Sequence, residues 1–137
     1  MKRSKINIQT ADEVEIIFYE AFMHCDIDVM AAIWADENVV CIHPGTGVIT
    51  GYDAVMRSWQ HILEGAAHMD IRYSVKNKRM TDELVTHVVI EEILNDNRVT
   101  AIVAATNIYQ RFDNGWLLSE HHGSLVNTER KEGETLQ

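Results

Sequence analysis

Polar side chains that could perform acid–base chemistry lie on the last two predicted strands, around an Asn-Gly pair at residues 114–115. An Asn-Gly pair between alternating residues is a strong signal for a two-residue hairpin turn. Pairing the strands through this turn places Tyr109 opposite Glu120 and Asn107 opposite His122. Because side chains alternate along a strand, these four would share one face. If that face lines a cavity, the quartet can bind a carbonyl group and move protons.

The same quartet has a plainer interpretation, in which it lies on an exposed or dimer-facing side of the sheet. A one-residue slip in strand pairing exchanges the two faces, so both interpretations stay open. His121 and His122 point to opposite faces of a regular strand and cannot share one metal ion. Since zinc needs three or four converging ligands, we expect no metal site, and we expect no cofactor.

Two side chains outside the hairpin could complete such a site. His43 directly precedes Pro44 at the end of a short strand predicted over residues 38–43. An imidazole titrates near neutral pH and could act as a general base, or it could instead hold the turn through backbone hydrogen bonds. Trp59 recurs with apolar neighbours at helical spacing, so it is first a core residue that could also form a cavity wall.

The elements that carry these residues follow one another in a clear order. Apolar residues at helical spacing predict three helices, over residues 10–24, from residue 26, and over residues 51–65. Alternation with a period of two then predicts four strands, over residues 69–76, 84–93, 98–112 and 116–126. Helices followed by an antiparallel meander are typical of an α+β domain with the helices on one sheet face.

Length and charge limit the domain organisation and the partners. The 137 residues make a single domain, with an ordered core from about residue 10 to residue 126 and loose tails at 1–9 and 127–137. Twelve Lys and Arg residues against twenty-one Asp and Glu residues give a formal net charge of −9, which disfavours nucleic acid and anionic membranes as partners. With two cysteines, no signal peptide and no membrane-length apolar run, we expect a cytoplasmic protein.

Several segments resemble the nuclear transport factor 2-like superfamily, above all its SnoaL-like and ketosteroid isomerase-like branches. They are Asp26 to Asp28, Trp34 to Val40, His43-Pro44-Gly45, Gly51 to Val55 with Trp59, Asn107 to Phe112, and Gly115-Trp116-Leu117 leading to His121-His122-Gly123-Ser124. The resemblance covers about residues 10 to 126. It implies a cone-shaped α+β barrel, in which a strongly curved, mostly antiparallel sheet wraps three N-terminal helices around a cavity. The last segment also looks like the association domain of calcium/calmodulin-dependent kinase, which shares the fold and only assembles subunits.

The chemistry of the family carries over only in part. Ketosteroid isomerases have a tyrosine in the first helix where this sequence places Phe18, with Tyr19 one position further on. They have a carboxylate base before a proline, where this sequence has His43, and an acid in a late strand, where it has Asn107. Polyketide cyclases of the family also use an acid, for which Glu120 is the nearest candidate. The missing acids argue against steroid isomerase activity itself.

The residues and the resemblance together predict a SnoaL-like, cofactor-independent isomerase, cyclase or hydratase that acts on an apolar carbonyl compound. The residues assigned to this site are catalytic His43, Tyr109 and His122, and substrate-binding Trp59, Asn107, Glu120 and Phe18. The alternative is a non-catalytic ligand-binding or association domain, in which the same face closes a dimer or a larger ring. In either case we expect a homodimer that forms through the outer sheet face.

Overall fold

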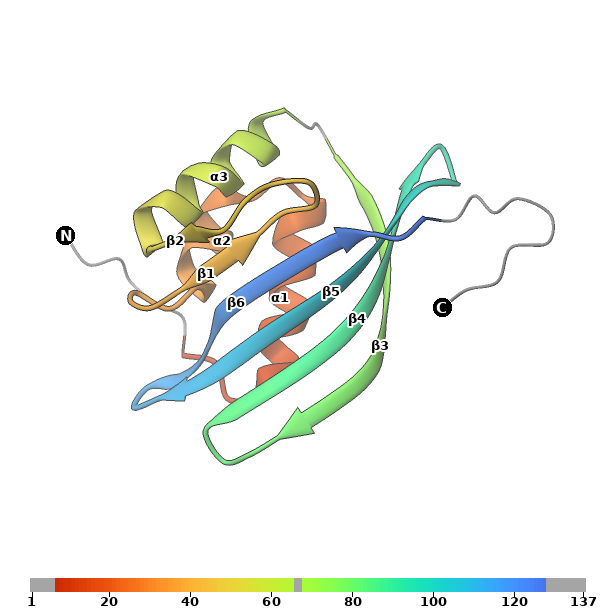
Figure 1. The fold of residues 1–137 in the computed structure, drawn as a ribbon. Helices are drawn as coiled ribbons and strands as arrows, with labels where there is room; N and C mark the ends of the chain where they lie inside the picture. The colour runs from red at the N-terminus through yellow and green to blue at the C-terminus, as the bar shows by residue number, and fades with distance from the viewer. Residues whose placement is uncertain (1–6, 66–67, 128–137) are drawn as a thin grey trace.

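The computed structural model describes residues 7–65 and 68–127, in which three helices pack against a curved six-stranded sheet (Figure 1). The helices are α1 (Ala11–Met23), α2 (Ile27–Ile33) and α3 (Tyr52–Glu64). The strands are β1 (Val40–Ile42), β2 (Ile49–Thr50), β3 (Asp70–Met80), β4 (Leu84–Asn95), β5 (Arg98–Phe112) and β6 (Gly115–Leu125). This confirms the predicted α+β class, with three helices and a curved sheet.

The order of strands across the sheet is β2-β1-β6-β5-β4-β3. Strands β3 to β6 form the expected antiparallel meander, whereas β1 runs parallel to β6. The early strand is shorter than predicted, and β2 was not predicted at all. With only two residues, β2 is too short to show a period in the sequence.

Side-chain caps explain where the first two helices begin. The Thr10 hydroxyl accepts a hydrogen bond from the Glu13 backbone N–H at 3.1 Å, and Asp26 Oδ1 accepts one from the Val29 N–H at the same distance. Each cap satisfies a backbone donor that the first turn of a helix leaves without a partner. The caps stand at residues 10 and 26, where the sequence predicted that these two helices begin.

Irregular pairing bends the long strands around α1. An extra residue in one strand of a pair increases the local twist and turns the strand. The strand register shifts between Val75 and Asn77, between Ile93 and Leu94, and between Ile108 and Tyr109. The sheet is therefore strongly curved without closing, as Figure 1 shows for β3 to β6.

Aromatic side chains fill the core between the helices and the sheet. Phe18 and Trp59 are both fully buried, and their rings meet edge to face with centroids 5.5 Å apart. Phe22 also packs against Trp59, with the two ring centroids 4.9 Å apart. Trp59 is thus the core residue that its helical spacing indicated.

The hairpin between β5 and β6 turns one residue earlier than predicted. Phe112 pairs with Gly115, so Asp113 and Asn114 form the two-residue loop. Gly115 has φ of +129°, and a Cβ there would lie 2.6 Å from the Ile8 carbonyl oxygen. Glycine is therefore needed as the first residue of β6, where the chain passes closely over Ile8.

Most of the predicted loose tails, at residues 1–9 and 127–137, lie outside the described residues. Ile8 falls within the first tail but is only 1% exposed, and its carbonyl oxygen accepts a hydrogen bond from the Trp116 N–H at 2.8 Å. In the part of the chain that the structure describes, no helix is both long and apolar enough to cross a membrane.

Candidate functional site

A cavity of about 450 Å³ lies between α3, the end of β1 and the inner face of the sheet. Its apolar wall consists of Phe22, Ile49, Ile62, Met69, Ile93 and Val103, together with Pro44 and Trp59. Its polar wall consists of His43, Thr46, Ser58, His61, Glu91 and His121. A cavity with an apolar wall and a few converging polar groups is the usual form of a small-molecule site.

A second hollow, of about 500 Å³, lies beside the start of α1 and the turn between β3 and β4. The polar residues in its wall are Gln9, Thr10, Asp12, Thr81 and Asp82, and all five are exposed. These polar groups are therefore solvated, whereas the polar wall of the first cavity includes buried side chains such as Glu91 and His121. The first cavity is therefore the better candidate for an active site.

Glu91, in β4, brings a buried carboxyl group to the cavity. It is 2% exposed, and Tyr19 in α1 donates a hydrogen bond to its Oε2 at 2.5 Å. Burial raises the pKa of Glu91 to about 7, although the hydrogen bond from Tyr19 acts in the opposite direction. At neutral pH this carboxyl group is therefore present both as an acid and as a carboxylate.

Sequence analysis did not identify Glu91, because it lies in a β-branched strand beside a second glutamate. The next residue, Glu92, pairs with Arg72 at 3.5 Å on the outer side of the sheet. The signal that could have found Glu91 is the alternation along β4, which places it on the same face as Val89. A carboxyl group on an apolar face is unusual unless it has a partner or a function.

His43 also lies in the cavity wall, as predicted, at the end of β1. Its Nε2 is 2.9 Å from Ser58 Oγ, which donates its own hydrogen to the Val55 carbonyl oxygen at 2.7 Å. Nε2–H is therefore the donor, and Nδ1 keeps the lone pair. Burial lowers the pKa of His43, so the ring is a neutral base at neutral pH.

Cys41 lies next to this histidine, with its Sγ 3.6 Å from His43 Nε2. Burial raises the pKa of the thiol to about 12. Only a thiolate is a strong nucleophile, so Cys41 does not act as one at neutral pH.

The predicted register of the last hairpin is wrong, and the error changes which histidine faces inward. Asn107 pairs with His121 instead of His122, because the turn comes earlier and a bulge follows it. His121 is 2% exposed and lines the cavity, whereas His122 is exposed on the outer face. Glu120 also points outward and is only partly buried. The structure therefore does not bring His122 or Glu120 to the cavity.

The other predicted site residues lie inside the protein, at different depths. Trp59 forms part of the cavity wall, and Phe18 packs behind it at 5.1 Å from the His121 ring. Asn107 is fully buried and bonds to His121. Tyr109 is also fully buried, but its ring stacks edge to face on His87, 5.1 Å away, outside the cavity wall.

His121 is held as a neutral ring. Its Nδ1 lies 2.5 Å from Asn107 Oδ1, which can only accept, so Nδ1 carries the hydrogen. Burial lowers the pKa of His121 to about 3, with smaller contributions from His43 and His122. With the Asn107 amide in this orientation Nε2 is a hydrogen-bond acceptor, and the ring stays uncharged at physiological pH.

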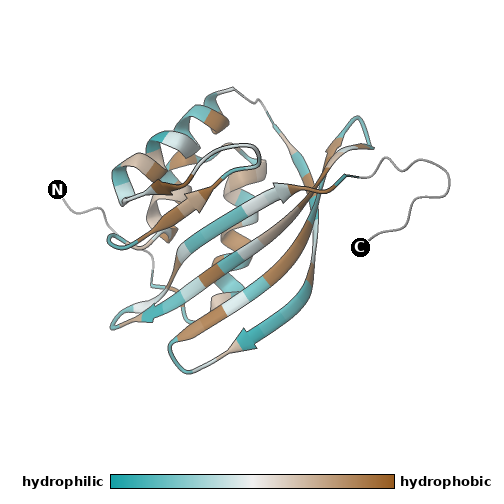
Figure 2. Ribbon diagram, in the orientation of Figure 1, coloured by the Kyte–Doolittle hydropathy of each residue, from teal (hydrophilic) through white to brown (hydrophobic). Residues whose placement is uncertain are grey.

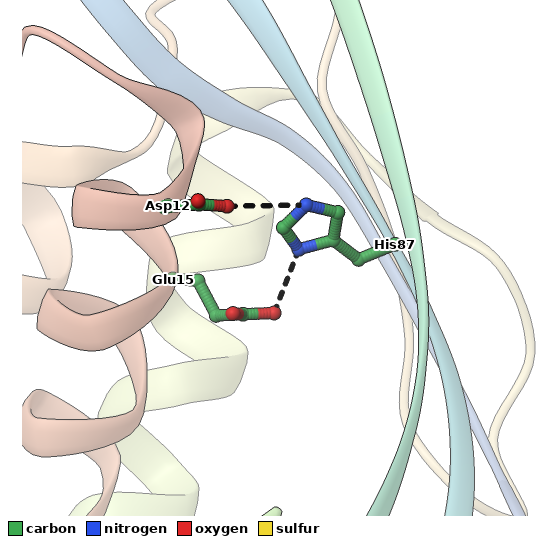
Figure 3. Close-up of side chains that lie close together, drawn as sticks. All are labelled: Asp12, Glu15 and His87. Carbon is green, nitrogen blue, oxygen red and sulfur yellow. Dashed lines mark hydrogen bonds and ion pairs between the residues drawn. The ribbon is translucent and has the colours of Figure 1, made fainter. Parts of the chain in front are cut away.

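A separate cluster lies behind Tyr109, where Asp12 and Glu15 in α1 flank His87 in β4 (Figure 3). His87 Nδ1 is 2.7 Å from Glu15 Oε2, and Nε2 is 3.5 Å from Asp12 Oδ1. Both ring nitrogens of His87 therefore face carboxylate oxygens of α1. Lys78 pairs with Asp12 at 3.1 Å. This geometry describes an ion-pair cluster that joins α1 to the sheet.

Known proteins with similar structures include a candidate association domain and a candidate dehydratase. The chain superposes on a candidate calcium/calmodulin-dependent protein kinase type II association domain from Thiobacillus denitrificans with a TM-score of 0.85, at 28% identity over 90% of this chain and 100% of that one. It superposes on a candidate dehydratase of the nuclear transport factor 2-like family from Streptomyces avermitilis with a TM-score of 0.76, at 28% identity over 84% and 92%.

The sequence is also similar to F-box protein SKIP8 from Arabidopsis thaliana, with 26% identity over 102 residues, or 73% of this chain. The chain spans 42% of the length of that protein. The family model for the SnoaL-like domain matches residues 16–128. As its sequence predicted, the chain belongs to the SnoaL-like domain family within the nuclear transport factor 2-like superfamily.

Proposed function

We propose that the chain binds a small, largely apolar carbonyl compound in the cavity and moves a proton at the carbon next to the carbonyl group. Proton transfer at this carbon is a step that isomerases, cyclases and hydratases of such compounds share. The supporting observation is that Glu91, His43 and His121 line one apolar cavity while burial shifts their pKa values in opposite directions. A raised carboxyl pKa beside lowered imidazole pKa values favours the uncharged form of each group, which separates the acid from the base.

The roles follow from which atoms can donate and accept. The protonated Glu91 donates its hydrogen to the carbonyl oxygen, and the lone pair on His43 Nδ1 takes the proton from the neighbouring carbon. The substrate becomes an enol, Glu91 a carboxylate and His43 an imidazolium, so the protons balance. His121 Nε2 accepts a hydrogen bond from the enol hydroxyl. The reaction uses only side chains and protons, and the similarity to a candidate dehydratase supports chemistry of this kind.

Hydrogen exchange tests this function before the natural substrate is known. Cyclic and linear ketones and enones are incubated with the protein in D₂O, and the loss of the proton next to the carbonyl is followed by ¹H NMR. We expect wild type to accelerate exchange of at least one of these compounds above the buffer rate. Glu91→Gln should lower that acceleration by about 10²-fold or more, because general acid catalysis contributes about 10²–10⁴-fold.

Glu92→Gln is the matched control, since it makes the same change one residue away on the outer side of the sheet. It should exchange the compound at the wild-type rate. The proposal is wrong if wild type accelerates no compound, or if Glu91→Gln is as fast as Glu92→Gln.

Self-association is a second candidate function, alone or together with catalysis. The outer face of β4 and β5 carries a group of neighbouring apolar side chains that includes Val88, Ile90, Ala104 and Ile108. Figure 2 shows hydrophobic segments along these two strands, between hydrophilic ones. A candidate association domain is among the similar structures, with a TM-score of 0.85. Both observations support a homodimer in which a second copy covers this face.

A further inference from the structure

Four side chains form one unbroken line of hydrogen bonds whose two ends both reach the cavity. His121 Nδ1 donates to Asn107 Oδ1 at 2.5 Å, and Asn107 Nδ2 donates to Tyr19 Oη at 3.1 Å. Tyr19 Oη then donates to Glu91 Oε2 at 2.5 Å. Tyr19 and Asn107 are 0% exposed and lie outside the cavity wall, which His121 and Glu91 help to form. Tyr19 and Asn107 therefore connect Glu91 to His121 through the protein interior, outside the cavity.

All three hydrogen bonds in this line run in the same direction, with each donor on the His121 side and each acceptor on the Glu91 side. An ionised carboxylate can only accept, so it fixes the direction of the Tyr19 hydroxyl hydrogen. Tyr19 Oη must then accept from the Asn107 amide, which turns Oδ1 towards His121 and fixes the hydrogen on Nδ1. An ionised Glu91 thus leaves His121 Nε2 with the lone pair, as an acceptor.

Protonation of Glu91 reverses the direction of each hydrogen bond in the line, while the same residues remain in contact. In the free protein the new carboxyl hydrogen donates to Tyr19 Oη, from which it turns to the carbonyl oxygen only in the proposed reaction step, and the hydroxyl hydrogen of Tyr19 turns to Asn107. The amide of Asn107 rotates by half a turn, so that Nδ2 donates to His121 Nδ1. His121 releases the Nδ1 hydrogen and takes up another at Nε2, and the net gain is the single proton on Glu91.

We propose that Tyr19 and Asn107 are positioning residues that make the hydrogen-bonding polarity of His121 follow the charge on Glu91. With Glu91 protonated, Nε2–H donates to a carbonyl oxygen. With Glu91 ionised, Nε2 accepts from a hydroxyl group. The ligand class is therefore a carbonyl compound paired with its hydroxyl counterpart, as in a ketone and its enol. This use of the line rests on the proposed function, whereas the coupling itself is a property of the free protein.

Other titratable groups around the line do not interrupt it. Tyr73 in β3 stacks on Tyr19 with ring centroids 4.1 Å apart, and Tyr109 in β5 lies among the same buried side chains. Burial raises the pKa of both tyrosines, so they stay neutral. His43 has a lowered pKa and is also neutral. Among the described residues of the cavity wall there is no lysine or arginine. Glu91 is thus the member of the line whose charge changes near neutral pH.

The tautomer of His121 can be observed directly in the free protein by ¹⁵N NMR of the imidazole ring, from about pH 5.5 to about pH 8.5. In wild type we expect the hydrogen to move from Nε2 to Nδ1 as the pH rises, with the same midpoint as the Glu91 carboxyl. In Tyr19→Phe, which lacks only the hydroxyl group, we expect one tautomer at every pH. Tyr73→Phe, the matched control, should behave like wild type.

Either of two results would overturn this inference. In wild type, His121 could keep one tautomer while Glu91 titrates, and this measurement needs no variant. In Tyr19→Phe, the tautomer could still change with the charge on Glu91. Neither result depends on a substrate, so the coupling can fail while ketone exchange succeeds, and exchange can fail while the coupling holds.

Discussion

The free energy of unfolding of Glu91→Gln, measured relative to wild type, is expected to rise steadily as the pH increases from about 4.5 to about 7. The folded protein binds a proton on Glu91 with a pKa of about 7, against an ordinary value of 4.5. Between these values the folded state keeps the proton and the unfolded state loses it, so the free energy of unfolding of wild type falls with rising pH. The slope is at most about 1.4 kcal/mol per pH unit, for a total on the order of 3 kcal/mol.

His121 has the opposite effect on wild type. Its pKa falls from 6.5 to about 3 on folding, so between these values the unfolded state binds the extra proton. The free energy of unfolding therefore rises with pH in this range. His121→Gln should lose stability relative to wild type as the pH rises to about 6.5, while Glu91→Gln gains it.

Urea unfolding at a series of pH values measures both differences. Glu92→Gln and His122→Gln are matched controls, because each neighbour lies on the outer side of the sheet. Any change in their stability relative to wild type measures the effect of removing a titratable group outside the cavity. A difference between Glu91→Gln and wild type that stays constant from pH 4.5 to 7 would show that Glu91 is an ordinary carboxylate.

Ile108→Arg is expected to convert a homodimer into a monomer. Ile108 lies on the outer face of β5, paired with Thr86 and Glu120 on the neighbouring strands. An arginine at this position in both copies would place two like charges in the interface, and burying an unpaired charge is costly. Light scattering after size exclusion should give twice 15.7 kDa for wild type and 15.7 kDa for the variant.

Ile16→Arg makes the same change on the exposed side of α1, where Ile16 is 49% exposed, and should remain dimeric. A wild-type mass of 15.7 kDa at micromolar concentration, or a dimeric Ile108→Arg, would contradict the proposal that two copies associate through the outer face.

Local sequence signals were enough to predict the elements but not the pairing of the last two strands. The caps at Thr10 and Asp26 and the alternation in the four long strands each act within a few residues, so a single sequence shows them. The face of a strand depends on the register, and a shift of one residue exchanges the faces. The earlier turn and the bulge after Ile108 together caused such a shift, which replaced His121 by His122 in the prediction.

The alternation along β4 shows that Glu91 faces inward, but its role as an acid depends on contacts that no local pattern contains. Glu91 meets its partner Tyr19 from 72 residues away, and its raised pKa comes from burial under the helices. At the positions where ketosteroid isomerases have acids, this sequence has His43 and Asn107, so the sequence predicted that the acids were missing. His43 was found because it directly precedes the single proline of the chain, which marks a turn.

The central claim, that an apolar cavity holds a carboxyl group as an acid at neutral pH, can be tested in the free protein. The measurement is the ¹³C chemical shift of the Glu91 side-chain carboxyl as a function of pH, assigned by its absence from Glu91→Gln. The structure predicts a midpoint near pH 7. A midpoint near 4.5, the ordinary value for glutamate, would contradict the proposed acid and the chemistry built on it.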